Sequence, residues 1–483
     1  MQLQDSQLFR QQAYINGQWT AGRQAPKFTV YNPYDQSPLA ELPDLGTEDT
    51  RAAIEAAAEA LPRWRSKSAA GRAKLLKKWF QLIHRHVDDL ALLLTSEQGK
   101  PLLEARGEVL YGASFVEWFA EEARRAYGDV IPGPGRGLRI LTLKQPIGVV
   151  GAITPWNFPN AMITRKIAPA LAAGCTVVVK PAEATPLSAL ALAELAERAG
   201  FPPGVINILT SNQPAAVGAE LCRHPLVRKL SFTGSTRVGK ILMRQCADTV
   251  KKLSLELGGN APFIVFDDAD LEAAVAGAIQ SKYRNAGQTC ICVNRIYVQN
   301  GIYERFVEAF QMAVRQLEMG NGLDEDVVIG PLINRAAVDK VDRLVRDAVE
   351  RGAEVVLGGE VATGNFYPPT VLLEARPDMA LHREEIFGPV AAVYRFETEA
   401  EVLELANATD YGLACYFYGR DYARIWRVAE ALEYGMVGIN TTQISTAVAP
   451  FGGVKESGIG REGSKYGLEE FMEIKYMCLG GVR

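Results

Sequence analysis

The sequence predicts an α/β fold that contains two parallel-sheet bodies. From about residue 146 onward, short apolar runs alternate with stretches of helical periodicity, a pattern typical of βαβ units and of a parallel sheet with helices on both faces. A second series of the same kind occupies residues 260–456. The length of 483 residues also favours two or three domains over one.

The first series begins with smaller elements. An Asn16-Gly17 turn between apolar residues predicts a strand pair within residues 11–35, and helices are expected across residues 48–126. A Pro- and Gly-rich break at residues 131–135 marks a linker or the start of a hairpin. The expected strands are then 147–153, 176–180, 206–209 and 229–232, and the expected helices are 162–173, 186–199, one around 215–222 and one that starts near 236.

The second series follows the same logic. The last stretch, residues 466–479, is expected to be an extended tail that can pair with a sheet edge. Strands are expected near 263–266, 295–298, 354–357 and 390–395, connected by helices such as 302–317 and 335–351.

Composition excludes several classes of protein. A net charge of −4 gives no indication of nucleic acid or an anionic membrane as a partner, and four histidines argue against a multi-histidine metal site, so no metal is expected. Seven cysteines without framework spacing indicate free thiols in a reducing compartment. With neither a secretory signal nor a long apolar run, the expected location is cytoplasmic.

A G-x-G-x-x-G pattern at residues 458–463 is interpreted as a structural loop. The dinucleotide-binding version of this pattern needs a preceding strand, a following helix and a complete βαβ unit. Only twenty residues follow Gly463, and the residues before the pattern are rich in turn formers.

Three polar residues are candidates for catalysis. If Cys290 starts a helix after Gly287, the helix dipole would lower its thiol pKa; alternatively, Cys290 and Cys292 are small buried apolar residues. Asn157, in a rigid turn after a buried strand, could donate to an oxyanion or could simply form the turn. Glu256, in an apolar run, would have a raised pKa suited to a general base if buried; otherwise it is a surface residue of an edge strand.

Taken together, seven segments resemble the aldehyde dehydrogenase superfamily over essentially the whole chain. A closer likeness, to succinate-semialdehyde and glutarate-semialdehyde dehydrogenases, lies in residues 161–166, 282–285, 444–445 and 460–467. The seven segments are Thr154-Pro-Trp-Asn-Phe-Pro159, residues 179–183, residues 232–236, residues 255–259, Gly287-Gln-Thr-Cys290, residues 385–389 and residues 450–453.

The resemblance implies a mechanism and a domain plan. Cys290 would attack the aldehyde, the Asn157 side chain and the Cys290 backbone N–H would hold the oxyanion, and Glu256 would activate water to release the acid. Glu256 argues against relatives that pass the acyl group to coenzyme A, and Lys166 and Glu462 match positions associated with proton relay or support of the cofactor. The implied domains are a Rossmann-like NAD(P)-binding domain (1–127 and 147–256), an α/β catalytic domain (257–456) and a small β oligomerisation element (128–146 and 457–483), hence a homodimer or homotetramer.

The resemblance also assigns the cofactor residues. Lys180 and Glu183 would hold the adenosine ribose, and Glu385 and Phe387 would bracket the nicotinamide. Because the Glu183 carboxylate would repel a 2′-phosphate by about 1–4 kcal/mol at ~4 Å, NAD is expected in preference to NADP. The complete set is Thr154, Pro155, Trp156, Lys180, Glu183, Gly234, Ser235, Gly239, Leu257, Glu385 and Phe387.

For the substrate, the resemblance implies that Arg165, Arg284 and Ser445 bind a distal carboxylate. Guanidinium groups bind carboxylates bidentately, which agrees with this role, although each arginine could instead form a structural ion pair. Residues 440–443 and 446–447 depart from the related enzymes beside Ser445, so the substrate could be succinate semialdehyde or glutarate semialdehyde.

The same residues are also compatible with an aldehyde dehydrogenase of broader or different specificity, and with an inactive family member that has a binding or structural role. A reversible Cys290–Cys292 disulfide is a further hypothesis. It needs a mobile loop, because residues two apart fit disulfide geometry poorly in regular structure.

Overall fold

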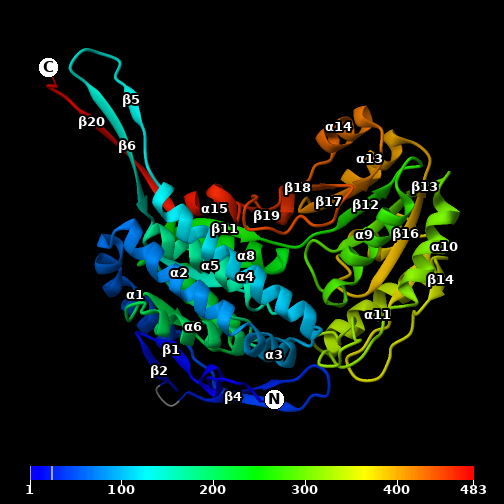
Figure 1. Cartoon of the computed structure of the whole chain (residues 1–483), viewed down its shortest axis with the longest axis horizontal. Helices are drawn as coiled ribbons and strands as arrows, with labels where there is room; N and C mark the ends of the chain where they lie inside the picture. Colours follow the sequence, from blue (N-terminus) through cyan, green and yellow to red (C-terminus); the bar gives the residue numbers. More distant parts are fainter. Residues whose placement is uncertain (1, 23–24, 483) are drawn as a thin grey trace.

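The computed structural model describes residues 2–22 and 25–482. Two sheets, each with its own helices, form two bodies that lie side by side, and a third sheet projects away from the first body (Figure 1). A separate strand pair, β3 (Lys27–Tyr31) with β4 (Pro38–Pro43), runs along the edge of the molecule near the N-terminus.

The first sheet has the strand order β19-β11-β10-β7-β8-β9-β1-β2. Its five central strands are parallel, so their carboxyl ends meet at one edge, where such sheets bind ligands. The strands are β1 (Ala13–Ile15), β2 (Gln18–Thr20), β7 (Val149–Ile153), β8 (Thr176–Lys180), β9 (Ile206–Ile208), β10 (Val227–Thr233), β11 (Lys252–Glu256) and β19 (Gly458–Ile459).

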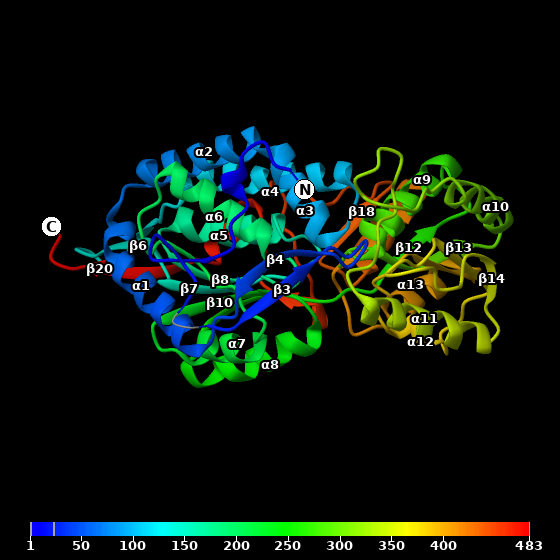
Figure 2. The ribbon, with the colours of Figure 1, turned by 90° about the horizontal axis from the view of Figure 1, so that it is seen from below.

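Helices cover both faces of this sheet because successive strand residues point to opposite sides. Val150 of β7 packs in one apolar cluster with α2–α6, whereas Val149 packs in another with α1, α7 and α8. Figure 2 shows α2, α4 and α6 on one side and α7 and α8 on the other. These helices are α1 (Thr47–Ser66), α2 (Ala69–Arg85), α3 (Val87–Gln98), α4 (Leu102–Glu122), α5 (Ala161–Ala173), α6 (Leu187–Ala199), α7 (Pro214–Arg223) and α8 (Thr236–Cys246).

The second sheet has the order β14-β15-β16-β13-β12-β17-β18 and is parallel except for β14. Its strands are β12 (Ala261–Val265), β13 (Val293–Gln299), β14 (Glu354–Leu357), β15 (Thr370–Leu373), β16 (Val390–Phe396), β17 (Ala414–Tyr418) and β18 (Met436–Ile439). Its helices are α9 (Leu271–Tyr283), α10 (Tyr303–Val314), α11 (Arg335–Glu350), α12 (Ala380–Arg383), α13 (Glu399–Asn407) and α14 (Tyr422–Ala431).

The third sheet is antiparallel and exposes apolar side chains. It consists of β5 (Val130–Pro132), β6 (Arg139–Pro146) and β20 (Met472–Leu479). Val130, Ile474 and Tyr476 are 75%, 69% and 62% exposed in the single chain. Exposed apolar groups gathered on a projecting sheet are typical of an interaction surface.

Most predicted elements are confirmed, β8 and β14 with unchanged bounds. The strands near 370–373, 414–418 and 436–439 were not predicted, and the extended tail is wrong in part, because α15 (Ser464–Glu469) packs on α4 and α5 before β20 begins. The G-x-G-x-x-G residues form β19 and a turn, which confirms the structural interpretation.

The domain plan stays a prediction. β19 lies within residues assigned to the oligomerisation element, yet it pairs with β11 in the first sheet. In the described residues, no helix is both long and apolar enough to span a bilayer.

Candidate active site

Cys290 lies in a turn between the short helix η4 (Arg284–Gly287) and β13. Asn285, Ala286 and Gly287, just before it, have left-handed φ angles of 53°, 53° and 75°. Glycine is needed at 287, because a Cβ there would lie 2.1 Å from the carbonyl oxygen of Gly388. This tight turn presents the half-buried thiol to a cavity of 250 Å³ between the two bodies.

The helix start and the lowered thiol pKa expected at Cys290 are both wrong. Cys290 lies in a turn that leads into a strand, so it does not gain from a helix N-terminus of its own segment. Burial raises the pKa of the Cys290 thiol to about 12, although Arg165 opposes this shift. The resting nucleophile is therefore a thiol, and its proton has to leave as the sulfur attacks.

Asn157 lines the same cavity from the first body. It follows the carboxyl end of β7, and only 5% of its surface is exposed. Its Nδ2 donates to the carbonyl of Gln288 at 2.9 Å, two residues before Cys290. The amide is thus held beside the nucleophile turn, where it can donate to an oxygen that gains negative charge.

Glu256 ends β11 and is 4% exposed, so it is a buried carboxyl and the surface interpretation is wrong. Its Oε2 has no hydrogen-bond partner among the described residues. Burial and the neighbouring Glu462 raise the pKa of Glu256 well above its ordinary value, against the opposing charge of Arg165. The raised pKa expected from the sequence is confirmed, and it suits a group that accepts a proton near neutral pH.

A buried ionic cluster adjoins Glu256. Glu462 pairs with Arg165 at 2.7 Å and with Lys166 at 2.6 Å, and all three side chains are almost fully buried. Although burial raises the pKa of Glu462, Lys166 and Arg165 together hold it below its ordinary value. Glu462 therefore stays charged, and its negative charge strengthens the binding of a proton to Glu256.

A second cavity, of 590 Å³, is lined by Thr289 and Ile291, the two sequence neighbours of Cys290. Arg284 and Ser445, both predicted from the sequence, line this cavity. Arg165 does not line it. Its guanidinium stacks on Phe451 at 4.1 Å and reaches the hydroxyl of Tyr111, a lining residue, at 3.5 Å.

The predicted cofactor residues fall into two groups. The 250 Å³ cavity is lined by Pro155, Trp156, Gly234, Ser235, Leu257, Glu385 and Phe387, whereas Thr154, Lys180, Glu183 and Gly239 lie outside its lining. The rings of Trp156 and Phe387 meet edge to face at 5.6 Å. Ser235 caps the N-terminus of α8, a favourable place for phosphate.

Glu385 receives a hydrogen bond from the Gly259 backbone N–H at 3.1 Å, and burial raises the pKa of Glu385 to about 7. Gly239 permits close packing, because a Cβ there would lie 2.5 Å from Leu257 Cδ2. The aromatic pair and the N-terminus of α8 beside this cavity fit the nicotinamide and phosphate part of a dinucleotide.

Three residues of this region were missed in the sequence. Lys340 of α11 lines the smaller cavity and Tyr111 of α4 the larger one. Lys100 lies behind Asn157 and donates to its carbonyl oxygen at 2.8 Å. Lys340 and Tyr111 lie on helices and Lys100 lies between α3 and α4, and none of them belongs to a motif that marks such a position.

The sequence model of the "Aldehyde dehydrogenase family" matches residues 19–477. The chain belongs to this family. It is 60% identical to the succinate-semialdehyde dehydrogenase [NADP(+)] GabD of Escherichia coli, over 99% of this chain and all of that one. It is 59% identical to the glutarate-semialdehyde dehydrogenase of Pseudomonas putida, over 99% of this chain and all of that one. A crystal structure of an E. coli NADP-dependent enzyme, 59% identical, superposes with a TM-score of 0.98 over 99% of this chain and all of that one.

The comparisons confirm the α/β fold and the oxidoreductase class, and they set aside an inactive family member. The preference for NAD expected from Glu183 is wrong, because the E. coli relative is named an NADP(+) enzyme. The structure supplies a reason. Lys180 Nζ donates to Glu183 Oε2 at 2.7 Å, so the carboxylate is balanced by a cation and does not act as a free negative charge.

The disulfide hypothesis stays a prediction. Cys290 and Cys292 both carry free thiols, and the Cys292 Sγ donates to the carbonyl of Lys282 at 3.3 Å. A disulfide would have to break this contact and open the turn that the Cys292 N–H closes on Thr289.

The raised thiol pKa predicts slow alkylation of Cys290 in the cofactor-free enzyme. The rate with iodoacetamide should rise about tenfold per pH unit from pH 7 to 10, because only the thiolate reacts and its fraction grows in that proportion. Mass spectrometry of quenched samples assigns the modified cysteine, and Cys290→Ser is the control. A rate that levels off near neutral pH would show that the thiol is not perturbed in this way.

Proposed function

We propose that this aldehyde dehydrogenase oxidises succinate semialdehyde to succinate with NADP. The observation that carries the proposal is the pair of cavities that adjoin the turn of Cys290. One is suited to the nicotinamide part of a dinucleotide, and the other presents the guanidinium of Arg284. The E. coli and P. putida relatives act on short semialdehydes by their names.

In the substrate cavity, Arg284 and Ser445 hold the distal carboxylate. Guanidinium and hydroxyl groups match a carboxylate, and a guanidinium in a partly enclosed cavity would disfavour an apolar aldehyde chain. The Arg165 guanidinium is already paired with Glu462, so Arg165 contributes to carboxylate binding only through its contact with the Tyr111 hydroxyl. The aldehyde group is then directed toward Cys290.

The chemistry begins when the Cys290 sulfur attacks the aldehyde carbon and the thiol proton passes to solvent water. The resulting thiohemiacetal oxygen accepts hydrogen bonds from Asn157 Nδ2 and the Cys290 backbone N–H, which stabilises the charge in the transition state. When bound, the nicotinamide supplies an acceptor for the hydride. Loss of the hydride leaves a thioester on Cys290.

Glu256 then takes a proton from water, which attacks the thioester and releases the acid. Lys166 and Glu462 keep a fixed charge arrangement beside Glu256 and offer a route for its proton. Release of the acid restores the Cys290 thiol.

For the cofactor, Lys180 and Glu183 would hold the adenosine ribose, and Lys180 would supply a cation for a 2′-phosphate. Gly234, Ser235 and Gly239, at or near the start of α8, would hold the pyrophosphate. Glu385 and Phe387 would hold the nicotinamide ribose and ring, together with Pro155, Trp156 and Leu257 of the same cavity and with Thr154.

Glutarate semialdehyde is the second candidate substrate, because a relative of almost equal identity is named for it. The loop at residues 440–447 decides between the two chain lengths, since Thr442, Gln443 and Ser445 line the substrate cavity. We further propose that the first body binds the cofactor, that the second carries the catalytic cysteine, that a homodimer or homotetramer forms through the third sheet, and that the enzyme is cytoplasmic.

Replacement of Arg284 by Ala tests carboxylate recognition. The kcat/KM for succinate semialdehyde should fall about 10- to 100-fold, the loss expected for a charge-assisted hydrogen bond of roughly 1.5–3 kcal/mol, while butanal changes little. Initial rates of NADPH formation measure this, with the exposed Arg315→Ala as the matched control. Equal losses for butanal and the semialdehyde would assign Arg284 a structural role.

Replacement of Glu256 by Gln should separate the two halves of the reaction. One equivalent of NADPH per active site should still form rapidly, after which the steady rate should be about 10²- to 10⁴-fold below wild type. In the wild type, the steady rate should fall as the pH is lowered through a pKa above the ordinary carboxyl range, because the protonated Glu256 cannot act as a base. Stopped-flow absorbance measures both; a mutant without a burst would contradict the assignment.

Replacement of Glu183 by Gln should lower the KM for NADP by about 3- to 10-fold and leave the KM for NAD almost unchanged, since it leaves Lys180 as an unpaired cation. The wild type should already turn over NADP with the higher kcat/KM. Glu197→Gln, an exposed glutamate of α6, is the control. An unchanged KM for NADP would place the 2′-phosphate away from residue 183.

Replacement of Ile474 and Tyr476 by Lys should dissociate the oligomer, because both project from one face of β20 and are exposed in the single chain. Light scattering after size-exclusion chromatography gives the mass. Glu473→Lys, on the opposite face of β20, should leave the mass unchanged. An intact oligomer in the double variant would exclude this sheet as the interface.

A further inference from the structure

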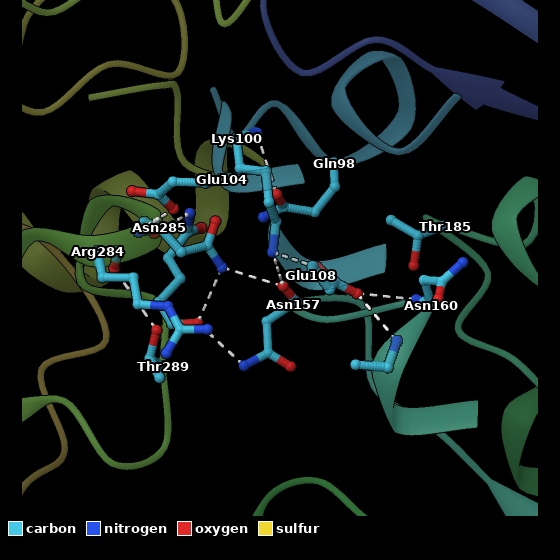
Figure 3. Close-up of polar contacts among 12 residues, drawn as sticks. Gln98, Lys100, Glu104, Glu108, Asn157, Asn160, Thr185, Arg284, Asn285 and Thr289 are labelled. Atoms are coloured by element: carbon cyan, nitrogen blue, oxygen red, sulfur yellow. Dashed lines mark hydrogen bonds and ion pairs between the residues drawn. The ribbon is translucent and has the colours of Figure 1, made fainter. Parts of the chain in front are cut away.

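A buried ion pair, Lys100 with Glu108, lies next to Asn157 (Figure 3). The side chains of Lys100 and Glu108 are 0% exposed, and Lys100 Nζ lies 2.6 Å from Glu108 Oε2. Neither residue lines the substrate or the cofactor cavity. Burial of two charges costs free energy that their attraction only partly returns, so the pair calls for an explanation.

Both members of the pair hold the chain around Asn157. Lys100 Nζ also donates to the Asn157 carbonyl oxygen at 2.8 Å and lies 3.8 Å from the centre of the Phe158 ring. Glu108 Oε1 accepts from the backbone N–H groups of Asn160 and Ala161, at 2.9 and 3.1 Å. The pair therefore binds residues 157–161 at both ends. Glu108 also accepts from the first N–H donors of α5, which has no side-chain cap of its own.

The nucleophile turn is tied to the same point. Asn285 Nδ2 donates to the Asn157 carbonyl at 3.0 Å and to the Gln288 carbonyl at 3.2 Å. The Asn285 backbone N–H donates to Glu104 Oε2 at 2.8 Å. Glu104 and Glu108 are four residues apart on one face of α4 (Figure 3). The first turns of this helix therefore bind both the segment 157–161 and the turn before Cys290.

We propose that Lys100 and Glu108 are positioning residues that fix Asn157 relative to Cys290. They touch neither substrate nor cofactor. They set the direction of the Asn157 carbonyl, and with it the place of the side-chain amide that binds the oxyanion. The inference rests on the proposed role of Asn157. A displacement of about 1 Å at such a group costs roughly 10²-fold in rate, and loss of one oxyanion donor costs about 10²- to 10³-fold.

The test is a double-mutant cycle between Lys100 and Asn157 in the full-length enzyme. Lys100→Met should lower kcat about 100-fold, with KM for aldehyde and for NADP within about threefold of wild type. In an Asn157→Ala background the same change should cost no more than about threefold, because the group that it positions is already absent. If Lys100 had only a structural role, Lys100→Met would lower kcat by the same factor in the wild type and in the Asn157→Ala variant.

Glu108→Gln is the second variant, should Lys100→Met fail to fold. Its amide oxygen can still accept from Asn160 and Ala161, but Lys100 loses its counter-charge, and we expect kcat to fall about tenfold in the wild type and little in Asn157→Ala. Glu194→Gln is the control, a buried glutamate paired with Arg10 and Arg198 at the far side of α6. Its kcat should stay within about twofold of wild type.

Two outcomes overturn the inference. An unchanged kcat in both variants, or an undiminished effect in the Asn157→Ala background, shows that the pair does not act through Asn157. If Asn157→Ala itself keeps wild-type kcat, then the proposed function of Asn157 fails first, and the positioning role falls with it.

Discussion

The site depends on the contact between two bodies, each built on its own sheet. Asn157 follows β7 and Glu256 ends β11, both at the carboxyl edge of the first sheet. Cys290 lies on the turn before β13 of the second sheet. The Asn157 amide bonds to Gln288, and Asn285 bonds back to Asn157, so hydrogen bonds across the contact fix nucleophile and amide together. Effective catalysis of this kind requires such fixed geometry, since orientation supplies much of the rate.

Buried charge gives the site its second property. Glu462 sits between Arg165 and Lys166, and it disfavours a second negative charge on Glu256. Burial likewise disfavours the thiolate of Cys290. Burial thus favours the protonated form of both groups, so each half of the chemistry includes a proton transfer.

The sequence predicts elements whose signal is local. β8, β14 and α5 follow from short apolar runs and helical periodicity. The apolar neighbours of Glu256 allow a buried base as one of two alternatives, and the structure decides for it. Remote contacts decide the rest. The left-handed turn before Cys290 is held by Glu104, a residue of α4 that lies far earlier in the chain. The effect of Glu183 on cofactor preference was misjudged because its charge is balanced by Lys180, and the sequence does not fix the direction of the Lys180 side chain.

A crystal structure of the Cys290→Ser enzyme with NADP and succinate semialdehyde would test the central claim most directly. The account predicts the distal carboxylate on the Arg284 guanidinium and the aldehyde oxygen within hydrogen-bond distance of Asn157 Nδ2. It also predicts the nicotinamide ring between Phe387 and the substituted side chain at position 290. An aldehyde bound in the other orientation, or a carboxylate held away from Arg284, would contradict it.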